Sequence, residues 1–237
     1  MRDAVYILRN RSRDEYSELR YSIRTLKNIT GWSGKIFIVG GFPVWGQNMV
    51  WIPAQDRQQP CYSISENKQI NALNKIRVAC ESDEISDDFI LMNDDFFIIE
   101  PTNIEYFQKG NLKDTVVEKE QFYHGSRYWC AMKRTAEEFD NPFDFELHFP
   151  IIYNKKRFLD LMDKYDMYKV YLHRSLYCNH YGITGPYLKD NKAYTINELM
   201  EKKSHPFFST GDKCGSHCRF VRIMDGILPE KSTYEKW

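Results

Sequence analysis

The stretch Phe89-Ile90-Leu91-Met92-Asn93-Asp94-Asp95-Phe96-Phe97-Ile98-Ile99 decides the fold, because it sets three polar residues between two apolar tetrads. A short apolar run between polar flanks is typical of a buried strand. We therefore expect a strand over 89–92 that ends at Asn93, and a return of the chain into the core over 96–99. The two adjacent carboxylates then lie where a buried strand ends.

Apolar runs and helical spacings alternate along the chain. Strands are expected over Ala4–Leu8, Lys35–Val39 and Met49–Ile52, with helices over 16–26, 72–80, 155–165 and 196–202. Strands separated by helices form a largely parallel sheet that is covered on both faces. We therefore expect an α/β fold with a mostly parallel central sheet flanked by helices. The sequence has neither repeats nor a linker rich in Gly, Pro or Ser, which favours a single domain over 1–237.

Composition disfavours some classes of protein. The 33 Lys and Arg balance 33 Asp and Glu, so no overall positive field draws the chain to nucleic acid or to an anionic membrane. No apolar run approaches the ~20 residues that cross a bilayer, and the first residues lack the apolar core of a secretory signal. We expect a cytoplasmic protein, of a bacterium or a phage-infected host cell, with reduced cysteines.

Asp94 and Asp95 are expected to hold a divalent cation. Two like charges between buried tetrads repel each other and lose hydration unless a cation or hydrogen-bond donors compensate them. Mg²⁺ and Mn²⁺ bind carboxylate oxygens together with the phosphate oxygens of a substrate. The alternative is a tight hairpin whose Asn-Asp-Asp tip is solvated.

Arginines gather around the first expected junction of strand and helix, at positions 9, 11, 13, 20 and 24. Arginine matches phosphate oxygens in a bidentate way, and the amino end of a helix adds partial positive charge. The group therefore suits a diphosphate that also reaches a cation on the acidic pair. The alternative is a solvated helix face on which these arginines pair with nearby acids.

His148 lies among apolar residues just before Pro150. It is either a structural histidine or a group that accepts a proton or holds a metal. Arg174-Ser175 and the stretch 207–212, which ends at Asp212, are two further polar islands beside apolar residues.

Cys214 and Cys218 form the only close cysteine pair in the sequence. With His205 or His180 they would make a structural zinc site. Reduced thiols without metal are the alternative.

Several of these segments resemble conserved regions of the Stealth family, which contains bacterial capsular-polysaccharide phosphotransferases and the eukaryotic N-acetylglucosamine-1-phosphotransferase. Residues 18–26, followed by 35–39 and 43–45, resemble its second region. The motif over 89–97 resembles the family's strand that ends in Asn-Asp-Asp. His148-Phe149-Pro150, Arg174-Ser175 and 207–212 follow in the family's order, so the resemblance covers most of residues 3–215.

The resemblance implies a glycosyltransferase-A-like fold that uses a nucleotide sugar, typically a UDP-sugar, with Mg²⁺ or Mn²⁺. Residues 1–110 would form the nucleotide-binding half and residues 111–237 the acceptor and catalytic half. His148 would activate the acceptor hydroxyl. Arg174 would stabilise charge on the transferring group. The metal and diphosphate would be bound by Asp94 and Asp95, with Asp212 as a third ligand, and Arg9, Arg20, Asn67 and Asn93 would lie along the donor.

Two reactions fit these residues, because a hydroxyl acceptor, such as a glycan, would attack either the anomeric carbon or the phosphorus next to the sugar. The first reaction transfers a sugar and the second transfers a sugar 1-phosphate. Two other functions stay open. One is a module that binds sugar nucleotides without turnover, and the other is a transferase acting on a hydroxylated nucleic-acid base, with phosphates on Lys155, Lys156 and Arg157.

Overall fold

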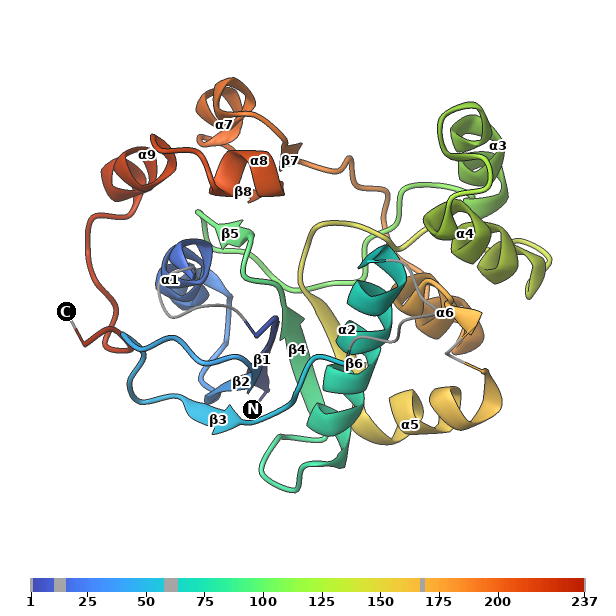
Figure 1. Ribbon diagram of the computed structural model, residues 1–237, viewed down its shortest axis with the longest axis horizontal. Helices are drawn as coiled ribbons and strands as arrows, with labels where there is room; N and C mark the ends of the chain where they lie inside the picture. Colours follow the sequence, from blue (N-terminus) through green and yellow to red (C-terminus); the bar gives the residue numbers. More distant parts are fainter. Residues whose placement is uncertain (1, 11–15, 58–63, 167–168, 237) are drawn as a thin grey trace.

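A five-stranded sheet lies at the centre of the computed structural model, which describes residues 2–10, 16–57, 64–166 and 169–236 (Figure 1). The strand order is β3 (Val50–Ile52), β2 (Ile36–Gly40), β1 (Asp3–Leu8), β4 (Asp88–Met92) and β6 (Ile151–Asn154). The first four strands are parallel, and β6 is antiparallel to β4. The expected mostly parallel sheet with flanking helices is confirmed.

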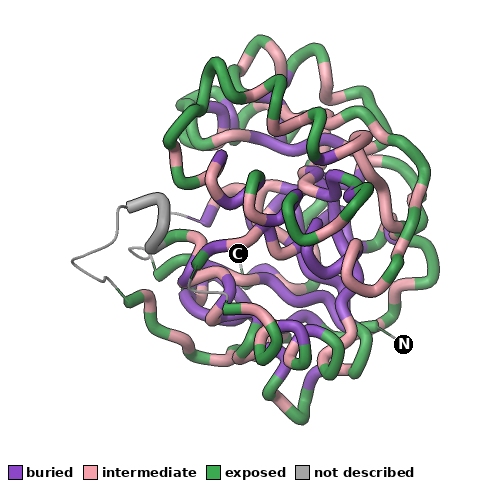
Figure 2. Tube along the Cα trace, turned by 90° about the vertical axis from the view of Figure 1, so that its right-hand side faces the viewer, coloured by how far each residue is buried: buried purple, intermediate pink, exposed green. Residues whose placement is uncertain are grey.

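Helices cover both faces of this sheet. Successive side chains along each strand point to opposite sides, so each strand contributes apolar residues to both faces. Val5 and Leu91 pack with apolar residues of α2 (Ile64–Glu81) and α5 (Lys155–Lys164). Tyr6 packs on the other face with residues of α1 (Ser17–Thr25). Figure 2 shows the buried residues gathered in the strands and the exposed ones on the outer segments. Burial on both faces explains why these strands are almost continuously apolar.

A second sheet takes up the other apolar tetrad. In this sheet β8 (Phe207–Thr210) lies between β5 (Phe96–Ile98) and β7 (Lys192–Ala193). β5 is antiparallel to β8, and β7 is parallel to β8. The strands on either side of Asp94 and Asp95 therefore belong to different sheets and do not pair with each other, so the alternative of a hairpin with a solvated tip is wrong.

The second half of the described chain holds more helices than its sequence pattern predicts. The expected helices over 155–165 and 196–202 are confirmed as α5 and α7 (Ile196–Lys202). Thr195 caps α7 by accepting a hydrogen bond from the Glu198 N–H at 3.3 Å. The helices that were not expected are α3 (Leu112–Tyr123), α4 (Arg127–Glu137), α6 (His173–His180), α8 (Asp212–Gly215) and α9 (Phe220–Ile227). No helix among the described residues is both long and apolar enough to span a bilayer.

A buried ion pair ties the C-terminal segment to α1. Arg24 donates from Nε and from Nη2 to the two carboxylate oxygens of Glu235, at 2.8 Å each. Both side chains are almost completely buried. Burial alone would raise the pKa of Glu235, but hydrogen bonds from Arg24 and Ser232 outweigh it, and the pKa lies below its usual value. The C-terminal segment is thereby part of the packed structure.

Replacing Glu235 by Gln is expected to lower the free energy of unfolding at neutral pH by about 3 kcal/mol, because Arg24 loses its buried countercharge and keeps only the longer contact, at 3.7 Å, with the exposed Asp225. The pKa of Glu235 is lowered by folding, so its contribution is present at neutral pH and is lost as the pH falls through the folded pKa. The loss caused by Glu235→Gln should therefore shrink on acidification. Urea unfolding at a series of pH values measures it.

Glu230→Gln is the matched control for this experiment. Glu230 lies 3.5 Å from Lys27 in an ion pair whose two side chains are largely exposed. Exposed ion pairs contribute about 0–1 kcal/mol. Equal losses in the two variants, or a loss in Glu235→Gln that does not change with pH, would contradict the assigned role of Glu235.

Candidate functional site

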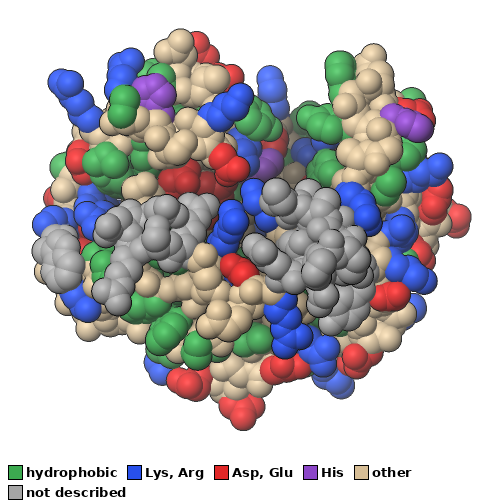
Figure 3. Space-filling model, in the orientation of Figure 1, with side chains coloured by type: hydrophobic (Ala, Val, Ile, Leu, Met, Phe, Trp, Pro, Cys, Tyr) green, Lys and Arg blue, Asp and Glu red, His purple; other side chains and the backbone are tan. Residues whose placement is uncertain are grey.

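A cavity of about 1210 Å³ opens at the carboxyl ends of β1 and β4, the edge at which open α/β sheets bind ligands. Figure 3 shows the surface hollowed between the α3–α4 side of the molecule and the α7–α9 side. Of the residues expected from the sequence, the cavity brings together Arg9, Asn93, Asp94, Asp95, His148, Arg174 and Asp212. Both halves of the chain therefore contribute to one site.

Strand register explains why His148 and Asp94 meet. β6 runs antiparallel to β4, with Ile151 opposite Leu91. His148 lies three residues before Ile151, and Asp94 lies three residues after Leu91, so both extend past the same end of the sheet. The two side chains accordingly line one cavity.

The turn that carries Asp94 is fixed to the core below it. The hydroxyl of Ser22 donates to the carbonyl oxygen of Asn93 at 3.4 Å and is also hydrogen-bonded to the Tyr6 hydroxyl at 3.0 Å. Burial and then the charge of Asp94 raise the pKa of Tyr6, against the opposing effect of the Ser22 hydrogen bond. Tyr6 therefore stays a neutral phenol and anchors the turn.

Asp95 is a half-buried carboxylate, and one of its oxygens has no hydrogen-bond partner among the described residues. Its Oδ2 lies 3.5 Å from Nζ of Lys192, whereas its Oδ1 is buried and accepts no hydrogen bond. Burial raises the pKa of Asp95, although the charges of Lys192 and Arg174 oppose the rise. A buried carboxylate oxygen without a donor is well suited to a hard divalent cation.

Asp94 and Asp95 both line the cavity and offer carboxylate oxygens of the kind that such a cation binds. Within the described residues, no three His, Cys, Asp or Glu side chains are arranged to hold an ion. Asp212 lines the cavity, but its side chain is 91% exposed and lies 3.7 Å from Lys68, because it opens the short helix α8 at the surface. The expectation that Asp212 completes the ligand set is not met. Mg²⁺ commonly binds one or two carboxylates and fills its other positions with water and substrate phosphates.

His148 forms a hydrogen-bonded pair with Asp190. Its Nδ1 lies 2.6 Å from Oδ2 of Asp190, and its backbone N–H donates to Oδ1 at 3.3 Å. A carboxylate only accepts hydrogen bonds, so Nδ1 carries the proton and Nε2 keeps its lone pair. Burial lowers the pKa of His148, although Asp190 opposes the fall, and the imidazole is therefore neutral at neutral pH. This is the arrangement of a general base that is oriented by an acid.

Arg174 braces the segment that carries His148. Its Nη1 donates to the carbonyl oxygens of Leu147 at 3.0 Å and Phe149 at 2.6 Å, which flank the histidine on both sides. The side chain is almost completely buried, yet it lines the cavity. Arg174 thus fixes the position of the histidine and places a positive charge at the wall of the site.

The opposite wall is built from the segment after β1 and from α2. The N–H of Asn10 donates to Oδ2 of Asp56 at 2.8 Å, and Asp56 also forms an ion pair with the buried Lys75. Arg9 and Lys68 line the same wall. Cations in this position suit phosphate oxygens.

Arg20 is not among the residues that line this cavity, unlike Arg9. Its Nε lies 3.5 Å from Glu235, and its guanidinium lies 5.0 Å above the ring of Trp45. The buried carboxylate of Glu235 attracts the arginine because an uncompensated charge would be costly there. The side chain of Asn67 and residues Arg11 and Arg13 lie outside the described residues.

A zinc site at Cys214 and Cys218 finds no support in the described part of the chain. Cys214 is buried, and burial raises its pKa to about 11, which disfavours the thiolate that zinc binds. Cys218 is exposed. The described cysteines form no disulfide.

Sequence analysis misses Asp190, Lys192, Tyr128 and Glu146. The run Lys189-Asp190-Asn191-Lys192 resembles an ordinary polar loop. It enters the site because β7 pairs with β8, with Lys192 beside Ser209, and β8 pairs with β5. For Glu146, one feature of the sequence indicates a place in the site, because this residue lies two positions before His148.

Comparison with known proteins bears on the fold. No protein-family model and no curated protein matches the sequence. Among solved structures, galactosyltransferase LgtC in complex with donor and acceptor sugar analogues matches with 10% identity and a TM-score of 0.56, over 99% of this chain and 98% of that one. An active-site mutant of LgtC matches with 11% identity and a TM-score of 0.50 over the same shares. The fold is glycosyltransferase-A-like.

The pKa of His148 is expected to lie below 6.5, with the proton of the neutral ring on Nδ1. Asp190→Asn should lower this pKa further, because the carboxylate stabilises the charged imidazolium. Two-dimensional ¹H–¹⁵N spectra of the histidine rings across a pH titration measure both properties, with His148→Gln identifying the resonance. A pKa of 6.5 or above, or a rise in Asp190→Asn, would contradict the pairing.

Proposed function

We propose that this chain transfers a sugar, or a sugar 1-phosphate, from a nucleotide sugar to a hydroxyl group of a carbohydrate acceptor. The observation that carries the proposal is that one cavity of a glycosyltransferase-A-like fold holds both the acidic pair after β4 and the His148–Asp190 pair. The LgtC structure supports it, since that enzyme holds donor and acceptor sugar analogues in a similar fold.

Asp94 and Asp95 would hold Mg²⁺ or Mn²⁺ together with the diphosphate of the donor. The bound ion supplies positive charge that neutralises the departing phosphate. Arg9 and Lys68, on the opposite wall, would bind phosphate oxygens, and Asn93 would contact the donor beside them. A UDP-sugar is the first donor to test.

His148 would accept the proton of the acceptor hydroxyl at Nε2 while the hydroxyl oxygen forms its new bond. Asp190 keeps the ring oriented and stabilises the imidazolium that results. Arg174 contributes a fixed positive charge at the wall, where it needs little rearrangement during the reaction.

The two reactions differ in the bond that breaks. In sugar transfer, the acceptor oxygen bonds to the anomeric carbon, the bond from that carbon to the phosphate oxygen breaks, and a nucleoside diphosphate leaves. In phosphosugar transfer, the acceptor oxygen bonds to the phosphorus next to the sugar, the bond from that phosphorus to the oxygen that bridges the two phosphates breaks, and a nucleoside monophosphate leaves. The LgtC structures support the first reaction, and the resemblance to the Stealth family supports the second.

Product analysis tests the proposal. The protein is incubated with Mn²⁺, a panel of UDP-sugars and a panel of oligosaccharides, and mass spectrometry identifies the products. Release of UDP with a new glycoside indicates sugar transfer, and release of UMP with a phosphodiester-linked sugar indicates phosphosugar transfer. If the donors bind and no sugar or sugar phosphate is transferred to any acceptor, the proposal fails and a binding module is favoured.

Asp95→Asn is expected to lower turnover at least ~100-fold with little loss of stability, because charge stabilisation at a transition state contributes several kcal/mol. Asp212→Asn is the matched control, since its exposed carboxylate lies on the same cavity, and turnover should fall less than about threefold. Initial rates and thermal unfolding of both variants check this. Equal effects of the two substitutions would remove the special role of Asp95.

A further inference from the structure

The wall of the cavity formed by α4 and the segment around His148 carries the carboxylate of Glu146 together with the cation Arg174. The pKa of the Tyr128 phenol is raised, first by burial and then by the carboxylates of Glu146, Asp144 and Asp190. Tyr128 therefore remains protonated and can donate a hydrogen bond into the cavity that it lines. The cations Arg9 and Lys68 lie on the α2 wall.

Tyr194 lies next to residues of the same cavity, although it is not itself among the residues that line it. It directly follows β7, and its side chain is 56% exposed. A Cβ atom built on Gly211 would lie 3.3 Å from the Tyr194 ring, and Gly211 sits between the cavity residues Thr210 and Asp212. Nζ of Lys192, the partner of Asp95, lies 5.9 Å from the centroid of the ring.

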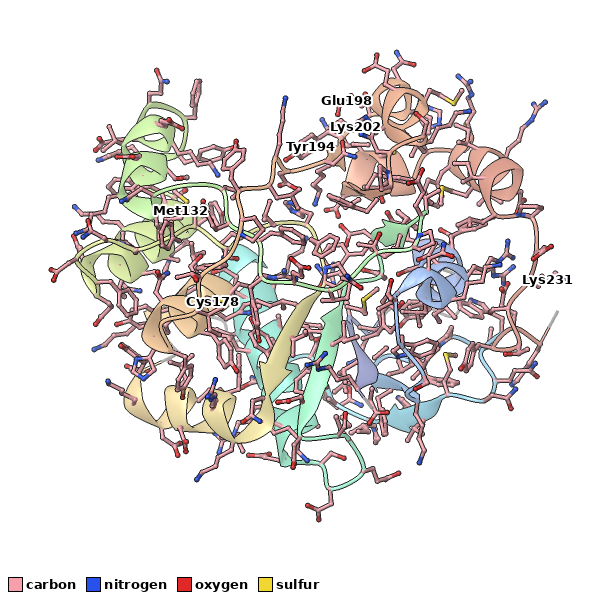
Figure 4. The ribbon with its side chains drawn as sticks, turned by 180° about the vertical axis from the view of Figure 1, so that it is seen from behind. Met132, Cys178, Tyr194, Glu198, Lys202 and Lys231 are labelled. Carbon is pink, nitrogen blue, oxygen red and sulfur yellow. The ribbon has the colours of Figure 1, made fainter. Side chains whose placement is uncertain are left out.

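The main chain holds Tyr194 in place although its ring is open to solvent. The N–H of Tyr194 donates to Oε2 of Glu198 at 2.8 Å, and Gly211 donates its N–H to Ala193 O at 2.9 Å. Figure 4 shows Tyr194 together with Glu198 and Lys202 on the α7 side, towards the gap that separates it from α3 and α4. An exposed aromatic ring on a fixed backbone offers a flat contact surface at little entropic cost.

From these positions we infer that Tyr194 and Tyr128 form the acceptor subsite, and that its ligand is a neutral or amino-bearing sugar ring of a carbohydrate. This inference rests on the proposed function and names its acceptor. The apolar face of the sugar would stack on Tyr194, and its hydroxyls would meet the Tyr128 phenol and Nε2 of His148. The carboxylates near Tyr128 accept hydrogen bonds from hydroxyl and ammonium groups.

The same charges disfavour the nucleic-acid alternative. A nucleic-acid acceptor would bring a row of phosphates to the wall that carries Glu146 and Asp190. This alternative assigns phosphates to Lys155, Lys156 and Arg157, but Nζ of Lys155 already donates to the carbonyl oxygens of Ser82 and Ile85 at 2.6 and 3.0 Å.

Binding of simple glycosides tests the inference without knowledge of the natural acceptor. Methyl β-glycosides of glucose, galactose, mannose, glucosamine and N-acetylglucosamine are titrated into the protein, and saturation-transfer NMR reports binding. At least one glycoside is expected to bind at millimolar concentration. Tyr194→Ala should weaken that binding about tenfold, and Tyr194→Phe should retain it, because the ring supplies the contact.

Trp51→Ala is the control, since Trp51 is an aromatic residue of similar exposure, at 53%, that lines a different cavity beside β3. It should leave glycoside binding unchanged. The inference is overturned if no glycoside binds, if Tyr194→Ala binds as well as the unaltered protein, or if the loss occurs in Trp51→Ala. It is also overturned if a short single-stranded oligonucleotide binds and depends on Tyr194.

A separate readout distinguishes this inference from the proposed function. Binding of UDP with Mn²⁺, followed by thermal stabilisation, should be the same in Tyr194→Ala and in the unaltered protein. If UDP binds and the glycosides do not, the acceptor subsite fails and the donor site stands. If neither UDP nor GDP, ADP or CDP stabilises the unaltered protein in the presence of Mn²⁺, the proposed function itself fails.

Discussion

The structure depends on how two apolar tetrads are buried on either side of Asn93, Asp94 and Asp95. The first tetrad completes β4 in the five-stranded sheet, and the second enters β5 in the three-stranded sheet. Two carboxylates therefore lie between two buried strands. A carboxylate that loses its hydration there is destabilising unless an opposite charge lies nearby. Lys192 supplies part of that charge, and the unsatisfied Oδ1 of Asp95 leaves a position for more.

The other residues of the site are positioned by the strands that pair with β4 and β8. β6 beside β4 brings His148, and β7 beside β8 brings Lys192, with Asp190 two residues earlier in the chain. One short segment thus delivers a carboxylate to the histidine and an ammonium to Asp95. A neutral imidazole held by a carboxylate and a half-buried acidic pair held near a cation are chemically different sites. Their closeness in one cavity is what favours transfer of a group from an activated donor to a hydroxyl.

Much of the sheet and part of the site could be predicted from local pattern. The continuous apolar runs at β1, β2 and β4 predicted strands buried on both faces, and the acidic pair between two tetrads predicted a compensated charge. Arg20 and Arg24 belong to a cluster of arginines that resembles a phosphate site, but in the structure both contact a carboxylate. Their carboxylate partner, Glu235, lies more than two hundred residues further along the chain. No local pattern reveals such a partner.

The sequence by itself determined which segments are buried, where the acidic pair lies relative to a strand end, and which histidine stands beside a strand. It did so because burial of apolar side chains and strand periodicity are local properties. Only the tertiary structure decided that β5 leaves the central sheet, that Asp190 and not a nearer acid orients His148, and that Asp212 faces solvent. Pairing between distant strands and the exposure of a single carboxylate depend on contacts that no neighbouring residue specifies.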